Sequence, residues 1–150
     1  MLNWLARPDL AAKAMLVVFC LLCAVLLIEV VAVASGASRN WLLLAEALPM
    51  PFFLAAIWSI RRAVLMVGAG AALRSLVSAM LARVGLALLL GGLAMVVAVP
   101  TIVWLTTGKG AVLRYDVAAI TVGVVGLGLM ILARVVAEAE ELQAELDEIL

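Results

Sequence analysis

Four long apolar stretches, separated by short polar segments, dominate the chain. They cover residues 14–35, 41–60, 84–107 and about 115–133, and their apolar residues run on without the alternation of a half-buried strand. Each is long enough for a helix to cross the ~30 Å hydrocarbon core of a bilayer, which takes about 20 residues. Because hydrocarbon cannot satisfy backbone hydrogen-bonding groups, we expect four transmembrane helices. The predicted fold class is therefore all-α, a four-transmembrane-helix bundle that forms a single integral membrane domain.

The segment between the second and third stretches, residues 61–83, has a different pattern. Its apolar residues recur at helical spacing, while Arg74 and two serines take the other side. As a fifth span it would place Arg74 near the bilayer centre, at a cost of several kcal/mol. We therefore expect a cytoplasmic amphipathic helix that lies on the membrane or packs on the tail. Its apolar face consists of Leu73, Leu76, Val77, Met80 and Leu81.

The tail, residues 134–150, is predicted to continue the fourth span as a helical acidic C-terminal extension. Apolar positions follow one another at spacings of 3, 4, 3, 4 and 3, which is the pattern of a short coiled-coil seam. The extension would be about 24 Å long as a helix. The seam would cover a second copy of the tail, the 61–83 helix or another protein; alternatively, the tail is a solvated helix that frays. The seam residues are Leu132, Val135, Ala139, Leu142, Leu146 and Ile149.

The composition agrees with lipid as the main solvent. Hydrophobic residues make up 69% of the 150 positions and charged residues 13%, whereas a soluble domain is nearer half apolar. Six of the ten acidic residues lie after residue 137, so the acidic part of the chain is the tail.

Basic residues near the span ends predict the orientation. Seven lie at the N-terminus, within 61–83 or just after the fourth span, and three lie on the opposite side. Both termini are therefore expected in the cytoplasm. The seven are Arg7, Lys13, Arg61, Arg62, Arg74, Arg83 and Arg134, and the three are Arg39, Lys109 and Arg114.

Acidic residues on the outer side are candidates for a polar site. At 1.5 Å per residue, Glu29 lies about 9 Å inside the end of the first stretch and Glu46 about 8 Å inside the second. Asp116 opens the fourth stretch on the same side. One interpretation is local ion pairing, in which Arg39 reaches a glutamate and a basic residue of the preceding loop, Lys109 or Arg114, pairs with Asp116. The other is a site at which neighbouring carboxylates share a cation or a proton.

Prolines and glycines mark where the helices bend and touch. Pro49, Pro51 and Pro100 fall in the outer halves of the second and third spans, where each is expected to kink its helix and free backbone carbonyls. Small residues are expected at the helix contacts. They are Ala87 with Gly91, and Ala119 with Gly123, Gly126 and Gly128.

The sequence contains few residues that could carry out catalysis. Histidine is absent, which removes the commonest general base and the usual zinc and haem ligand. Cys20 and Cys23 stand three apart in the first span without other soft ligands, and we expect them to be buried inside the protein and to pack as apolar side chains. We therefore predict no enzyme activity, no cofactor and no metal site.

Two parts of the sequence resemble a known family. They are the run "IRRAVLMVGAGAAL…LARVGLALLLGG" and the close "GVVGLGLMILARVVAEAEELQAELDEIL". Both resemble the YoaS-like family of small bacterial four-helix membrane proteins, catalogued as a domain of unknown function, although this chain has Ala71-Ala72-Leu73 where that family has an aromatic residue after the glycine. The resemblance implies a bacterial inner-membrane protein, frequently encoded beside a small helix-turn-helix regulator. It implies no activity and no site residues.

The leading functional hypothesis is a non-enzymatic membrane protein that acts by protein–protein interaction, in a regulatory or scaffold role. The tail and the 61–83 helix would dock a partner, as a homo-oligomer or within a larger membrane complex, with no direct nucleic-acid binding. The candidate docking charges are Arg61, Arg62, Arg74, Arg83, Glu138, Glu141 and Glu145. One alternative is a small proton- or cation-coupled transporter that uses Glu29 and Glu46. Another is an accessory subunit of a larger membrane complex.

Overall fold

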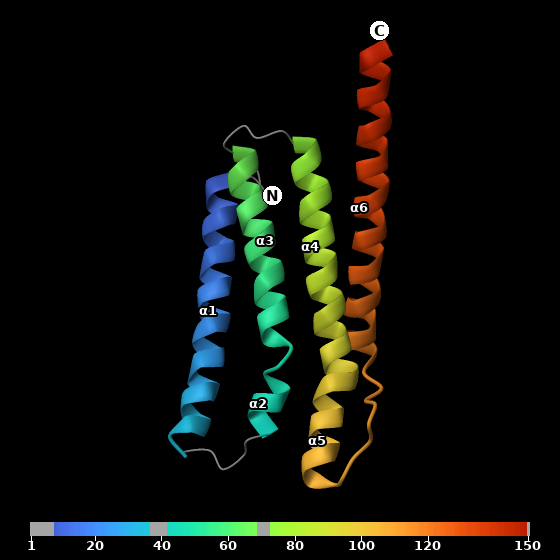
Figure 1. Cartoon of the computed structure of the whole chain (residues 1–150). Coiled ribbons are helices and arrows are strands. Elements are labelled where there is room, and N and C mark those ends of the chain that lie inside the picture. Colours follow the sequence, from blue (N-terminus) through green and yellow to red (C-terminus); the bar gives the residue numbers. More distant parts are fainter. Residues whose placement is uncertain (1–7, 37–41, 69–72, 150) are drawn as a thin grey trace.

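The computed structural model describes residues 8–36, 42–68 and 73–149, and every regular element in these ranges is a helix (Figure 1). The all-α prediction is confirmed. The elements in chain order are α1 (Pro8–Ala34), α2 (Leu42–Glu46), α3 (Met50–Gly68), α4 (Leu73–Leu93), the π-helical segment η1 (Ala94–Ala98), α5 (Val99–Thr107) and α6 (Val117–Ile149). Four helical stretches are long and apolar enough to cross a membrane, as expected: Ala12–Ala34, Leu42–Met66, Leu76–Thr107 and Val117–Gln143.

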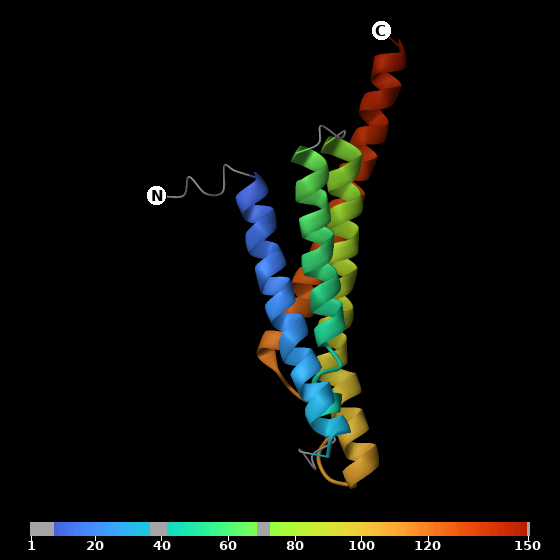
Figure 2. The same ribbon diagram turned by 90° about the vertical axis from the view of Figure 1, so that its left-hand side faces the viewer.

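The long helices alternate in direction and form an open row (Figure 1). α1 packs against α3, α3 against α4, and α4 against α6, with no comparable contact between α1 and α4 or between α3 and α6 in the described ranges. Figure 2 shows α1 leaning away from α3 toward the N-terminal end of α1. Apart from Ala12, none of the α1 side chains that the structure describes is fully buried. A row of this kind suits a bilayer, because lipid tails solvate apolar side chains about as well as a protein interior does.

The closest packing joins α4 to α6 through glycines. A Cβ atom at Gly85 would lie 2.6 Å from the carbonyl oxygen of Gly126, and one at Gly126 would lie 2.6 Å from the carbonyl oxygen of Gly85. About two turns further along α4, a Cβ atom at Gly92 would lie 2.7 Å from the carbonyl oxygen of Ala119. Gly85 and Gly92 are seven residues apart, and so are Ala119 and Gly126, which is the repeat of coiled-coil packing. The absence of side chains at these positions lets the two backbones touch.

The prolines lie at helix boundaries within the second and third spans, and do not kink a continuous helix as expected. The second span is divided into α2 and α3 by a turn at residues 47–49, so that Pro49 stands before α3 and Pro51 lies in its first turn. In the third span Pro100 follows η1 and opens α5. Proline has no N–H to donate to the carbonyl four residues earlier, which here belongs to Val96. That carbonyl accepts a hydrogen bond from the backbone N–H of Arg114 instead, at 3.1 Å.

The prediction of a separate amphipathic helix over residues 61–83 is wrong. Residues 61–68 complete α3, and the remaining part from Leu73 onward opens α4. The division follows from Gly68, where α3 ends, since glycine is a poor helix former. Arg74 is consequently the second residue of α4 and precedes the candidate span Leu76–Thr107, so the segment need not form a separate helix to keep this charge out of a span.

Candidate functional site

One end of the bundle, called the outer end here after the orientation predicted from the sequence, holds a polar cavity of about 330 Å³. Glu46 contributes from the end of α2, and Arg114 and Asp116 contribute from the segment that leads into α6. Pro49, Met95 and Val99 complete the lining. Two carboxylates and one guanidinium therefore share this space.

Backbone contacts hold the segment before α6 against the third span. Besides the bond from Arg114 to Val96, the Thr101 hydroxyl lies 2.6 Å from the Val97 carbonyl oxygen and 3.2 Å from that of Val112. The segment is thus tied to the place where Pro100 supplies no N–H to the Val96 carbonyl. Its position is a consequence of the break in the third span.

Asp116 acts as the N-terminal cap of α6. Its Oδ1 accepts hydrogen bonds from the backbone amides of Ala118 at 3.0 Å and Ala119 at 3.2 Å. These amides have no helical acceptor, and the positive end of the helix dipole stabilises a carboxylate there. The partner of Asp116 is therefore the helix itself. In the described part of the chain no ion pair joins Arg114 to either carboxylate of the cavity.

The predicted outer site is assembled differently from the expectation. Glu46 and Asp116 line one cavity, as the site hypothesis required, with Arg114 beside them. Glu29 is half-buried on α1 and is not among the residues that line this cavity. Arg39, the predicted partner of a glutamate, lies outside the described residues. The sequence placed Glu29 and Glu46 at a similar depth, but depth along a helix says nothing about the direction in which a side chain points.

The opposite end of the bundle carries cations in each groove between neighbouring helices. Lys13 and Arg61 line a groove between α1 and α3, Arg62 and Arg83 line one between α3 and α4, and Arg134 lines one between α4 and α6. We call these five residues the basic belt. None of the three linings includes an acidic side chain in the described part of the chain.

Trp58 anchors the belt between α1 and α3. Its ring lies 5.3 Å from that of Phe19, centroid to centroid, and the Arg61 guanidinium stands 5.2 Å from the Trp58 ring centroid. This cation–π contact fixes the guanidinium at the helix surface. The Nε of Arg61 is buried and has no hydrogen-bond acceptor among the residues that the structure describes. The basic belt thus includes a hydrogen-bond donor, the Arg61 Nε, that is not used within the described residues.

The predicted seam of the tail lies on the outside of α6. Leu132, Val135 and Leu142 are 55%, 58% and 62% exposed, and Ala139 is exposed as well. The face that packs on α4 contains Gly126 and Ala133 instead. Ala133 follows Leu132 directly, so the two faces are rotated by about 100° about the helix axis. The side chains of Leu146 and Ile149 lie outside the described residues.

The predicted docking charges divide into two groups. Arg61, Arg62 and Arg83 belong to the basic belt, and Arg74 lies in the first turn of α4 with its side chain outside the described part. Glu138 and Glu141 are exposed on α6, and the side chain of Glu145 is outside the described part. The arginines therefore line helix–helix grooves of the bundle and do not form a docking helix of their own.

No cluster of metal-ligating groups accompanies these features. Within residues 8–36, 42–68 and 73–149 there is no group of three or more cysteine or acidic side chains that could hold a metal ion. Cys20 and Cys23 are free thiols; Cys20 is exposed on α1, so the expectation that it packs inside the protein is wrong.

Comparison with protein-family models, with curated proteins and with solved structures gives no match to this chain, so its family membership stays a prediction from the sequence.

Proposed function

We propose that this chain is a non-enzymatic integral membrane protein that acts through protein–protein interaction, with the C-terminal part of α6 as its docking helix. The observation that carries the proposal is the length of α6, which runs past the ends of α3 and α4 as a single helix (Figures 1 and 2). A helix that leaves the bundle loses the packing that stabilises most helices in proteins. A partner that covers its apolar seam would supply that packing.

Two faces of α6 differ in what covers them. The face with Gly126 and Ala133 is occupied by α4 within the chain. The adjacent seam face is apolar and has no covering element among the described residues, although its first positions lie within the span and can face lipid. Further along α6, Ala139 and Leu142 continue the seam among the acidic residues Glu138, Glu140 and Glu141, where an exposed apolar stripe favours association.

The charge of the tail indicates the chemistry of the partner. Residues 135–150 contain six acidic residues and no basic residue. A second copy of the same tail could cover the seam but would form no interhelical salt bridges beside it. A helix or groove with an apolar strip and basic residues along its flanks would satisfy both the seam and the charge. A small helix-turn-helix regulator, which the family resemblance suggests, is one candidate of this kind.

A pair of substitutions in the tail tests the proposal. Leu142→Asp places a charge in the seam, whereas Ala144→Asp adds the same charge about 200° further round the helix. The two variants and the wild type are cross-linked in native membranes, and each complex is quantified together with the oligomeric state. We expect Leu142→Asp to lose the complex and Ala144→Asp to keep it. If both variants and the charge reversal of Glu138, Glu141 and Glu145 leave every complex and the oligomeric state unchanged, the docking function is wrong.

A transport function is the second candidate, because the outer cavity brings two carboxylates together. The cavity argues for Glu46 and not for Glu29 as the working group. Asp116 is engaged with the start of α6 and Arg114 offsets one negative charge, so the arrangement also fits a purely structural role. In proteoliposomes, substrate-induced proton release that Glu46→Gln abolishes and Glu29→Gln retains would favour transport. An absence of release from the wild type would exclude it.

The accessory-subunit alternative makes a different prediction. Native mass spectrometry after extraction in gentle detergent would then find this chain with unlike subunits in fixed ratio. A homo-oligomer alone would contradict it.

A further inference from the structure

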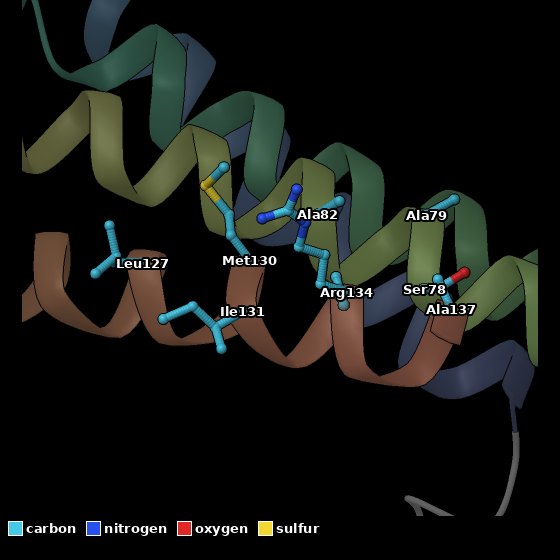
Figure 3. A pocket seen from close by; sticks show the side chains of 9 residues that line it. Ser78, Ala79, Ala82, Leu127, Met130, Ile131, Arg134 and Ala137 are labelled. Atoms are coloured by element: carbon cyan, nitrogen blue, oxygen red, sulfur yellow. The ribbon is translucent and has the colours of Figure 1, made fainter. Parts of the chain in front are cut away.

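The largest cavity near the basic belt lies between α4 and α6. Its volume is about 620 Å³, within the range of roughly 300–1,000 Å³ that is usual for small-molecule sites. Eight of its nine lining residues are small or apolar apart from the hydroxyl of Ser78, and the ninth is Arg134 (Figure 3). Figure 3 shows the Arg134 side chain extending from α6 across the cavity toward Ala82 on α4. The cavity therefore combines a hydrocarbon-like wall with a single cation.

The position of Arg134 places it at the border between hydrocarbon and headgroups. Residues 117–133 carry no charge, so Arg134 is the first charged residue after an apolar stretch of about 25 Å. Arg83 on α4 likewise directly precedes the uncharged stretch 84–108. Ala79 lines both the Arg134 cavity and the neighbouring groove with Arg62 and Arg83, so the two grooves adjoin on one face of the row.

From this geometry we infer that the α4–α6 groove binds an anionic phospholipid of the leaflet at this end of the bundle. An acyl chain lies along the wall formed by Leu127, Met130 and Ile131, and the phosphate accepts hydrogen bonds from the Arg134 guanidinium. Basic pockets between membrane helices on the cytoplasmic side are suited to anionic headgroups, and this is the side that the positive-inside rule assigns to the basic belt. Arg62 and Arg83 on the adjoining groove add to the positive potential.

A second copy of the chain is a poorer occupant of the same groove. In a two-fold symmetric contact the same patch meets itself, so Arg134 would face the partner's own arginine, and the next acidic residue on α6 is Glu138, about one turn beyond it. The linings of both grooves contain no acidic residue in the described part of the chain to relieve this repulsion. A lipid phosphate removes the problem because it brings the counter-charge with it.

The test measures lipid retention by the full chain in neutral detergent. Native mass spectrometry counts bound dioleoyl phosphatidylglycerol against dioleoyl phosphatidylcholine, which has the same chains and no net charge. Arg134→Gln should lower the preference for phosphatidylglycerol about fivefold, since one basic residue near an anionic membrane surface is worth about 1 kcal/mol. Arg134→Lys should restore most of the preference. Arg114→Gln, which removes the same charge at the outer end, should leave it unchanged.

A second variant separates the groove from the charge. Ala137→Phe fills the cavity from an exposed position and should reduce retention of both lipids in the groove while Arg134 is intact. The inference is overturned if Arg134→Gln retains the wild-type preference, or if Ala137→Phe has no effect on either lipid. A third outcome would also overturn the inference. In it, inorganic phosphate binds the wild type but not Arg134→Gln, and the wild type shows no preference between the two lipids. A dimer that Ala137→Phe converts to monomer would assign the groove to a second copy and overturn it as well.

Discussion

Replacement of Gly126 by alanine should push α4 and α6 apart. The new Cβ atom would lie 2.6 Å from both the Gly85 carbonyl oxygen and the Leu89 backbone nitrogen, whereas ordinary van der Waals contact begins at 3.4 Å. The backbones would have to separate by about 0.8 Å, the difference between these distances, and a gap of this size forfeits roughly a quarter to a half of each dispersion contact. Neither neighbour is a flexible side chain, so neither can move alone.

The expected loss of stability is a balance of two effects. Overpacking of a closely packed interface costs about 1–3 kcal/mol. Replacing glycine by alanine in a helix gains about 0.5–1 kcal/mol, because alanine loses less conformational entropy. The free energy of unfolding of Gly126→Ala should therefore fall by about 1.3 kcal/mol at the midpoints of these ranges, and by about 2.5 kcal/mol at most.

Gly128→Ala is the matched control on the same helix. A Cβ atom at Gly128 would have nothing within 4 Å, so only the helix-propensity gain applies, about 0.5–1 kcal/mol. The free energies are measured by reversible unfolding in mixed detergent micelles with increasing dodecyl sulfate, followed by circular dichroism and tryptophan fluorescence. Equal stability of the two variants would refute the argument that the two backbones are in contact.

Two further predictions concern the outer end of the bundle. Asp116→Ala should lower the free energy of unfolding by about 1 kcal/mol because the amides of Ala118 and Ala119 lose their acceptor, while Asp116→Asn should keep most of the stability; equal losses in both variants would contradict the capping role. Pro100→Ala should accelerate hydrogen exchange at the Arg114 amide, because the restored N–H at position 100 competes for the carbonyl that Arg114 now uses; unchanged exchange would show that the proline does not free this carbonyl.

The spans were predictable because their signal is local. The uncharged stretch between Arg83 and Lys109 is longer than a bilayer needs, and no arrangement of neighbours alters that requirement. The capping role of Asp116 was not predicted, since the residue was expected to pair with Lys109 or Arg114 or to share a cation; its place directly before an apolar helix was the available signal. The error in 61–83 came from treating Arg74 as the centre of one helix. The glycines at 68 and 70 were the signal for a break.

Helix partners were predictable only in part. Ala119 and Gly126 were expected at a contact, but Gly85 and Gly92, which they meet on α4, were not singled out. Their spacing of seven residues was the available signal. In lipid, an apolar helix face can contact either another helix or an acyl chain. Hydrophobicity alone therefore does not predict which helix faces pack together. Glu29 illustrates the same limit, since its depth was accessible from the sequence and its direction was not.

The open row has a consequence for the order in which the protein assembles. During synthesis α1 and α3 leave the ribosome first, yet the tightest contact of the molecule joins α4 to α6 in the second half of the chain. α1 and α3 can pack on each other as soon as both are made, whereas the contact of α3 with α4 forms only after the third long helix is complete. α1, which packs mainly on α3, is the helix that can leave the assembly with the least disturbance to the rest. A chain truncated before α6 would keep α1, α3 and α4 but lose the pair of surfaces that gives the bundle its closest packing.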